Sequence, residues 1–257
     1  MERIDIVNEN IKLIQRTEGL NFGTDALLLA AYIDPARKYK RGMEYGSGTG
    51  IVSLFALHRD KIAEITALEV QEEYASITER NAALNGLADR LHAVHTDLRD
   101  YCCAPDECVD IVFSNPPYMK CDTGRANAVE EKNAARHEQN GTIYSFLEGA
   151  KKHLRCGGAF VAVYRTDRLI DLIDAMRKNK IEPKRMTYVH ADSSSMPSMV
   201  LVEGRSGGGE GLVVTPPLLL YRDMAHTDYS DEMQFILKNG SFPEAFYILN
   251  KKRRGDK

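Results

Sequence analysis

The chain lacks long apolar runs. In this sequence of 257 residues, no apolar run approaches the roughly 20 residues that are needed to cross a bilayer. The longest runs are short, for example residues 26–33. The segment 1–5 does not resemble a signal peptide. The five cysteines, an odd number, include no Cys-x-x-Cys pair, which argues against a disulfide framework and a zinc ribbon. We therefore expect reduced thiols, no membrane association and a cytoplasmic location.

An excess of positive charge is also missing. The formal net charge is −3 and the pI is near 6.2, so contact with nucleic acid requires a local basic patch. Basic residues occur in the long polar stretch 119–141, whose length is typical of functional loops. They also occur near the C-terminus, where a short basic tail is commonly just solvated. These residues are Lys120, Arg125, Lys132 and Arg136, and Lys251, Lys252, Arg253 and Arg254.

The centre of the chain alternates strand-like and helix-like segments. Strands are predicted at 42–45, 65–70, 91–95, 109–113 and 158–164, and helices at 51–59, 72–85, 143–154 and 169–178. This alternation predicts an α/β fold, with a parallel sheet covered by helices on both faces and ligands at the carboxyl ends of the strands. Beyond residue 182 the pattern is strand-like, so we expect the sheet to end in antiparallel strands.

Shorter elements flank this region. Residues 3–15 alternate polar and β-branched side chains and predict a hairpin or two short strands. Residues 25–32 predict an apolar helix, for which Thr24 or Asp25 is a good N-cap. The chain is divided into an N-terminal hairpin and helix (1–36), a central α/β domain (37–222) and a C-terminal helical extension with a basic tail (223–257). A hairpin connection explains the glycine-rich stretch 206–211.

A glycine-rich turn follows the first central strand. The run 43–50 reads Met-Glu-Tyr-Gly-Ser-Gly-Thr-Gly, and its glycines let the backbone approach a ligand closely. A dinucleotide fingerprint requires its third glycine at position 51, where this chain has Ile, so an NAD site is disfavoured. An acidic residue before alternate glycines suits a ligand with an ammonium group, which Glu44 is placed to hold. The residues expected at this ligand are Gly46, Ser47, Gly48 and Gly50.

Polar residues mark the ends of the next three strands. Glu69 ends the second strand, where a carboxylate can accept both ribose hydroxyls. Asp97 follows the third strand and is placed to accept from an adenine exocyclic amine, and Asn115 follows the fourth. Val70 and Leu98, which come directly after the two acids, are counted with the same site. Such an ordered set at strand ends predicts one cofactor site.

The fourth strand runs into Asn115-Pro116-Pro117-Tyr118. Proline has no backbone N–H and a fixed φ, so two in a row end a strand with a rigid turn and keep the preceding residue extended. This turn can aim the Asn115 side-chain carbonyl and the Pro116 main-chain carbonyl at one point, with the ring of Tyr118 beside it. Two acceptors and a stacking surface suit a flat amine. The alternative is an ordinary loop, because Asn and Pro dominate turns.

Together these motifs resemble the class I S-adenosylmethionine-dependent methyltransferases, in the amino-methylating branch with an Asn-Pro-Pro-Tyr motif. Segments 22–30 and 196–205 resemble the bacterial tRNA1(Val) adenine-N6 methyltransferase family. The resemblance implies a Rossmann-like, seven-stranded, mostly parallel sheet with an antiparallel C-terminal strand. It also implies S-adenosylmethionine at the residues above, catalysis by 115–118, and methylation of N6 of an adenosine in tRNA, next to the anticodon. Segment 190–195 departs from this family, being Ser-rich where relatives are more basic.

Other functions remain as alternatives. A protein-glutamine N5-methyltransferase uses the same motif on an amide, but such enzymes carry a sizeable helical domain where this chain has about forty residues. An rRNA amino-methyltransferase stays open, whereas no region is large enough for separate readout of duplex DNA. Ile51 disfavours a nucleotide-binding module or NAD enzyme. No metal site is expected from His92, His95, Cys102 and Cys103, whose spacing fits no known pattern, and no obligate protein partner is evident.

Overall fold

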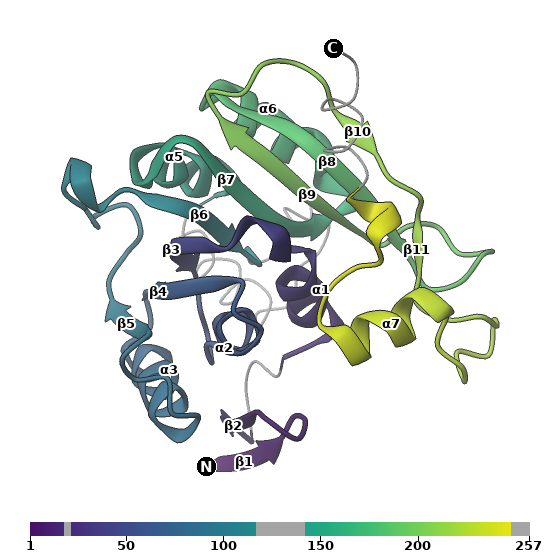
Figure 1. Ribbon diagram of the computed structural model, residues 1–257, viewed down its shortest axis with the longest axis horizontal. Coiled ribbons are helices and arrows are strands. Elements are labelled where there is room, and N and C mark those ends of the chain that lie inside the picture. The colour runs from purple at the N-terminus through teal and green to yellow at the C-terminus, as the bar shows by residue number, and fades with distance from the viewer. Residues whose placement is uncertain (18–21, 117–141, 248–257) are drawn as a thin grey trace, which may run out of the picture.

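A mostly parallel sheet forms the centre of the molecule (Figure 1). The computed structural model describes residues 1–17, 22–116 and 142–247. Within these ranges the sheet has nine strands in the order β10-β8-β9-β7-β6-β3-β4-β5, with β11 beside β8. In it, β9 runs antiparallel to both of its neighbours, and the other pairs are parallel. The predicted class I α/β fold with an antiparallel strand late in the chain is confirmed.

The strands of this sheet follow the predicted order. They are β3 (Tyr39–Tyr45), β4 (Ile62–Glu69), β5 (Leu91–His95), β6 (Val109–Ser114), β7 (Leu154–Arg165), β8 (Ile181–His190), β9 (Met199–Ser206), β10 (Val213–Val214) and β11 (Leu218–Leu219). The glycine-rich stretch 206–211 leads from β9 to β10, which pairs in parallel with β8. The prediction of a hairpin connection there was therefore wrong, because the chain crosses to the far side of β8 instead of turning back beside β9.

Helices cover both faces of the sheet (Figure 1). One hydrophobic core joins the sheet to α1, α2 and α7, and a second core on the opposite face joins it to α5 and α6. Alternation along β6 supplies both cores, because Ile111 and Phe113 belong to the first and Val112 to the second. The helices are α1 (Thr24–Tyr32), α2 (Ile51–His58), α3 (Glu72–Leu84), α5 (Ile143–His153), α6 (Leu169–Lys178) and α7 (Asp231–Asn239). Short 3₁₀ turns are η1 (Pro35–Arg37), η2 (Pro105–Glu107), η3 (Thr166–Arg168) and η4 (Glu244–Phe246).

Helix α1 begins differently from the prediction. Its N-cap is Gly23, which has extended backbone and no side chain to offer a capping hydrogen bond. The expectation that Thr24 or Asp25 caps this helix was therefore wrong, because both residues already lie inside the helix. The Asp25 carboxylate accepts from the Ala26 N–H within the helix and also from a side chain of another element.

The N-terminal hairpin is a separate two-stranded sheet of β1 (Glu2–Ile6) and β2 (Lys12–Arg16), as predicted. Asn81 of α3 and Asn85, the C-cap of that helix, pair through their side chains with the main chain of β2. Asn85 bonds the N–H and C=O of Lys12 at 2.9 and 2.7 Å, and Asn81 bonds those of Ile14 at 2.7 and 3.0 Å. Asn81 Nδ2 also donates to the carbonyl oxygen of Thr49 at 2.9 Å. The Asn81 side chain thus links the hairpin to the glycine-rich turn.

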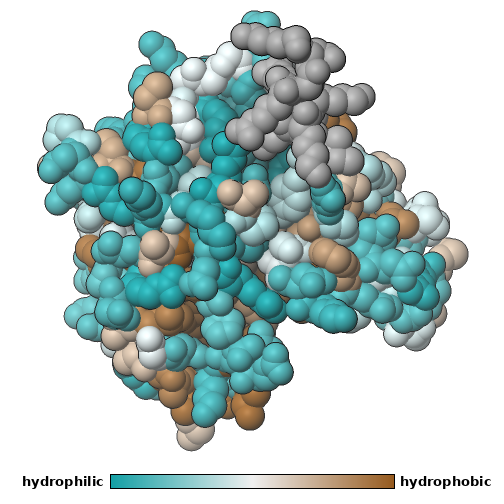
Figure 2. All heavy atoms as spheres, viewed as in Figure 1, coloured by the Kyte–Doolittle hydropathy of each residue, from teal (hydrophilic) through white to brown (hydrophobic). Residues whose placement is uncertain are grey.

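The molecular surface is predominantly hydrophilic on the face that Figure 2 shows, with hydrophobic side chains gathered at its lower end. The hairpin lies at that end in Figure 1, and Ile4 and Ile6 of β1 are exposed. Among the described residues no helix is long and apolar enough to cross a membrane.

Buried cations anchor the C-terminal end of α1. Arg185 of β8 pairs with Glu203 of β9 at 2.8 Å and donates to the carbonyl oxygen of Tyr32 at 2.6 Å. Its guanidinium also lies 3.8 Å from the centroid of the Tyr32 ring. Lys61 donates to the carbonyl oxygens of Ala30 and Ala31 at 2.7 and 3.0 Å. Both side chains donate to helix-end carbonyls that have no intrahelical partner. Burial lowers the pKa of Lys61 to about 7, so Arg185 is the residue that carries a permanent charge at this negative end of the helix dipole.

We expect Glu203→Gln to lower the free energy of unfolding by about 3–5 kcal/mol, because Arg185 would lose the carboxylate that balances its buried charge. The matched control is Asp228→Asn, which weakens a pair whose Arg222 and Asp228 side chains are 48% and 59% exposed. Its expected effect is below about 1 kcal/mol. Urea unfolding followed by circular dichroism measures both, and equal losses would contradict the anchoring role.

Candidate active site

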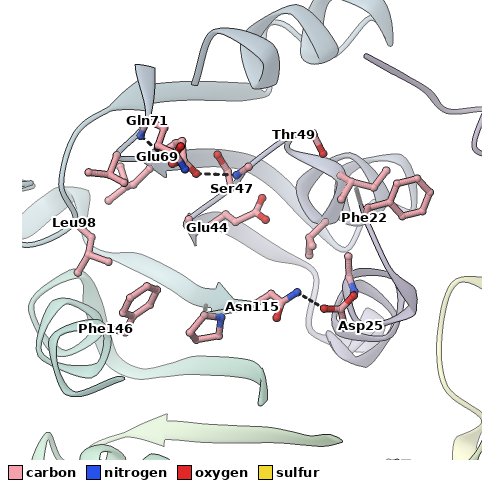
Figure 3. Close-up of a pocket in the computed structure, with 18 of the residues that line it drawn as sticks. Phe22, Asp25, Glu44, Ser47, Thr49, Glu69, Gln71, Leu98, Asn115 and Phe146 are labelled. Atoms are coloured by element: carbon pink, nitrogen blue, oxygen red, sulfur yellow. Dashed lines mark hydrogen bonds between the residues drawn. The ribbon is translucent and has the colours of Figure 1, made fainter. Parts of the chain in front are cut away.

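A cavity of about 410 Å³ opens at the carboxyl ends of β3, β4, β5 and β6 (Figure 3). The parallel register explains its position, since Tyr45 of β3 pairs with both Leu68 of β4 and Ser114 of β6. The chain segments that leave these strands therefore start side by side. The lining residues are Phe22, Gly23, Asp25, Ala26, Glu44, Gly46, Ser47, Gly48, Thr49, Ile51, Val52, Leu68, Glu69, Val70, Gln71, Thr96, Asp97, Leu98, Asn115, Pro116 and Phe146.

The glycine-rich turn forms one wall of the cavity. Gly46, Gly48 and Gly50 have φ values of 66°, 55° and 76°, a left-handed region that other residues rarely adopt. Gly46 and Gly48 line the cavity, whereas Gly50 does not and is instead the N-cap of α2. A Cβ on Gly50 would lie 2.8 Å from the side chain of Thr78, so this glycine also allows α2 and α3 to pack closely.

Glu69 joins β4 to the turn. Its carboxylate accepts from the Gly48 N–H and from the Gln71 N–H, both at 2.9 Å. Burial raises the pKa of Glu69 against the opposing effect of these hydrogen bonds. Each carboxylate oxygen has more than one acceptor position, so both can also receive hydroxyl donors from a ligand. The backbone bonds fix the carboxylate in the orientation that such a ligand meets.

Glu44 is a buried acid at the end of β3, and the hydroxyl of Ser53 donates to it. Burial, with a smaller contribution from the nearby charge of Glu69, raises the pKa of Glu44 to about 8 against the opposing effect of the Ser53 hydrogen bond. The carboxyl is therefore largely neutral at pH 7 in the ligand-free protein. A cation placed beside it would favour the ionised form and lower this pKa.

Asp97 has the opposite electrostatic environment. It accepts from the backbone N–H and from Nε of Arg99, both at 2.9 Å, and the hydrogen bond to the Arg99 side chain lowers the pKa of Asp97. The acid therefore stays ionised and remains an acceptor. Leu98 lies beside it and faces Phe146 of α5 across the same end of the cavity (Figure 3).

Asn115 and Pro116 line the cavity from the end of β6. The Asn115 side chain points toward α1, where its Nδ2 lies 2.7 Å from Oδ2 of Asp25 (Figure 3). Pro117 and Tyr118 lie outside the described residues, as do the basic residues predicted in the long polar loop and in the C-terminal tail.

The structure brings most of the predicted site residues to one cavity. Glu44, Gly46, Ser47, Gly48, Glu69, Val70, Asp97, Leu98, Asn115 and Pro116 all line it. Their individual roles stay predictions. Sequence reasoning gave no site role to Phe22, Asp25, Gln71 or Phe146, which also line the cavity. The chain before α1 offered a signal, since 22–30 was part of the family resemblance, but Phe146 offered only a helical apolar pattern.

The sequence from residue 17 to 179, more than half of the chain, matches the family model described as "Methyltransferase small domain". The chain belongs to this methyltransferase family. Two similar proteins are described as tRNA1(Val) (adenine(37)-N6)-methyltransferases. That of Parabacteroides distasonis is 29% identical over 191 residues, covering 72% of this chain and 76% of its own. That of Bacteroides thetaiotaomicron is 28% identical over 214 residues, covering 83% of this chain and 86% of its own.

Solved structures share the fold of this methyltransferase. A predicted O-methyltransferase from Agrobacterium tumefaciens superposes with a TM-score of 0.69 at 20% identity, over 85% of this chain and 98% of its own. A 16S rRNA N2 G1207 methyltransferase from T. thermophilus, in complex with AdoMet and guanosine, has a TM-score of 0.54 at 16% identity, over 80% and 50%. At these sequence identities the similarity shows a shared fold and nothing more.

The residues of the cavity fit S-adenosylmethionine, and the predictions of a methyltransferase and of this cofactor are confirmed by the family. Buried acids at Glu44 and Glu69 suit a ligand that carries positive charge and hydroxyl donors, and none of the described residues that line the cavity is a lysine or an arginine. Leu98 and Phe146 give an apolar surface for a flat ring. Among the residues that the structure describes, no group of three or more His, Cys, Asp or Glu side chains is placed to hold a metal ion.

We expect the affinity for S-adenosylmethionine to rise between about pH 5.5 and 7.5, by up to about tenfold per pH unit. The pKa of Glu44 is about 8 in the free protein, so its carboxyl must release a proton to pair with a cation. Isothermal titration calorimetry measures the affinity and the proton release. Glu44→Gln, which has no proton to lose, is expected to flatten the pH dependence. The same slope in both proteins would exclude this pairing.

Proposed function

We propose that the protein methylates the exocyclic N6 amine of an adenosine in tRNA, next to the anticodon, in the cytoplasm. The observation that carries the proposal is the position of Asn115 and Pro116, which line the same cavity as the acids Glu44, Glu69 and Asp97. An amine acceptor and a methyl donor would thus meet at the end of β6. The descriptions of the relatives from Parabacteroides distasonis and Bacteroides thetaiotaomicron support adenine in tRNA as the substrate.

The proposed chemistry is mainly a matter of positioning. S-adenosylmethionine supplies a sulfonium methyl group, whose carbon–sulfur bond breaks with its electron pair going to sulfur. The lone pair of the adenine amine is delocalised into the ring, which makes the amine a poor nucleophile. Carbonyl oxygens of Asn115 and Pro116 would accept its two hydrogens and favour a pyramidal nitrogen with its lone pair directed at the methyl carbon. One hydrogen of the new ammonium leaves as a proton to solvent, so no covalent enzyme intermediate is needed.

A base in a single-stranded loop suits this site better than a paired base. The target must leave its stack, which costs a few kcal/mol in a duplex and less in a loop. Stacking on the ring of Tyr118, a residue outside the described ranges, would contribute about 1–3 kcal/mol. The second candidate, methylation of a protein glutamine, would use the same two carbonyl acceptors on a planar amide, and the experiment below includes it.

Purified protein incubated with methyl-labelled S-adenosylmethionine is expected to transfer label to total tRNA, and digestion should yield labelled N6-methyladenosine. Parallel reactions with release-factor protein and with DNA are expected to stay unlabelled. A tRNA1(Val) transcript with guanosine in place of the adenosine next to the anticodon should lose the label, because the target amine is absent. Label found only in methylglutamine, or in no acceptor, would contradict the proposal.

Asn115→Ala is expected to bind S-adenosylmethionine within about twofold of wild type and to lose turnover by on the order of 10²–10³-fold, as when one preorganised polar contact to a reacting group is removed. The matched control is Asn239→Ala at the exposed end of α7, where the side chain donates to the Phe235 carbonyl oxygen at 2.8 Å. Its turnover should not change. Loss of both binding and turnover in Asn115→Ala would instead mean that Asn115 is a structural turn residue.

A further inference from the structure

The hydrogen bond between Asn115 and Asp25 determines which way the Asn115 amide faces. The bond joins residues 90 positions apart, from the end of β6 to the first turn of α1. A carboxylate only accepts hydrogen bonds, whereas a carboxamide carries a donor and an acceptor on its two branches. With Nδ2 of Asn115 at 2.7 Å from Asp25, the carbonyl oxygen must take the other branch. The opposite orientation would bring two oxygen acceptors together, which is repulsive.

This orientation matters for a methyl acceptor. The hydrogens of an amine need an acceptor, and the Nδ2 branch of an amide would repel them. We propose that Asp25 is a positioning residue that locks the Asn115 amide in the orientation in which its carbonyl branch, and not its NH₂ branch, meets the substrate amine. The inference rests on the proposed function, which makes Asn115 the group that contacts this amine.

The carboxylate of Asp25 is itself held in place. Its Oδ1 accepts from the backbone N–H of Ala26 at 2.9 Å, while Oδ2 accepts from Asn115 at 2.7 Å. The N-terminal end of α1 carries positive partial charge, which favours an anion there. Gly23 leaves the necessary space, because a Cβ at this position would lie 2.6 Å from Oδ1 of Asp25. The buried side chains of Lys61 and Arg185 hold the other end of the helix.

The negative charge of Asp25 has a second effect. Its hydrogen bond polarises the Asn115 amide, so the carbonyl oxygen becomes a stronger acceptor than that of an amide bonded to a neutral group. The amine nitrogen gains positive charge as its bond to the methyl carbon forms. A carboxylate one side chain away stabilises that charge more than it stabilises the neutral amine, which is the condition for a faster chemical step.

The first test compares Asp25→Asn with Asp25→Glu. An asparagine at this position keeps the shape but can donate as well as accept, so the Asn115 amide would no longer have one preferred orientation. We expect its single-turnover methyl-transfer rate to fall on the order of 10- to 100-fold, with KM for tRNA and Kd for S-adenosylmethionine within about twofold of wild type. Asp25→Glu, which keeps an acceptor-only group, should recover part of the rate. An unchanged rate, or a loss confined to cofactor affinity, would overturn the proposal.

The second test leaves Asp25 in the sequence and displaces it. Gly23 has φ −111° and ψ −177°, a backbone that alanine adopts without strain, so Gly23→Ala acts on the Asp25 carboxylate. We expect a loss of rate comparable to that of Asp25→Asn. The matched control is Gly209→Ala, because a Cβ on Gly209 meets no atom within 4 Å. Equal rates for the two alanine variants would count against the proposal.

The third test asks whether Asp25 acts through Asn115. In an Asn115→Ala background, Asp25→Asn should cause no further loss of rate, since the amide to be oriented is gone. Additive losses in the double variant would show a separate role for Asp25 and overturn the proposal.

A readout without substrate separates this inference from the proposed function. The side-chain NH₂ signals of Asn115, identified by their loss in Asn115→Ala, should shift in the ¹H–¹⁵N spectrum of Asp25→Asn. If wild type transfers no label to tRNA while this shift is seen, the proposed substrate is wrong, and the rate tests use whichever acceptor is labelled. If tRNA is methylated equally fast by wild type and Asp25→Asn, the positioning role is wrong and the proposed function stands.

Discussion

The site depends on the parallel pairing of β3 with a strand on each side. Hydrogen bonds from Tyr45 to its neighbours fix the register with β4 and β6, so three strands end at the same level. A slip of one residue would move every side chain of β6 to the opposite face of the sheet and move Asn115 away from the Glu44 carboxyl. The two hydrophobic cores oppose such a slip, because each takes alternate residues of the same strand. Packing thereby sets the geometry of the polar groups.

Local pattern predicted most of the fold, and the strand-end acids could be placed because parallel strands share one carboxyl edge. Contacts between distant segments were not predictable in this way. Asp25 was interpreted as a helix cap because that role is local, whereas its partner lies 90 residues further along the chain. Phe146 reaches the cavity only through the packing of α5 against β6 and β7, which the order of elements does not specify. The connection from β9 to β10 passes to the far side of β8, where β10 pairs in parallel. The glycine-rich sequence of this connection does not distinguish such a crossing from a hairpin turn.

Charge is distributed unevenly around the cavity. Desolvation keeps Glu44 largely protonated, while a bidentate arginine keeps Asp97 ionised. The two acids of this cavity therefore differ in protonation: Glu44 can release a proton, whereas Asp97 is a fixed acceptor. The environment of each carboxyl sets this difference: burial for Glu44, and the hydrogen bond to Arg99 for Asp97.

Asn81 connects two parts of the molecule that are usually considered separately. Its single carboxamide closes one hydrogen-bonded ring with β2 and reaches the glycine-rich turn at Thr49. The free energy of docking the N-terminal hairpin is therefore not separable from that of ordering the turn. Thermodynamic linkage then works in both directions: a ligand that stabilises the turn strengthens the attachment of the hairpin, and a partner that pulls on the hairpin weakens the hold on the ligand.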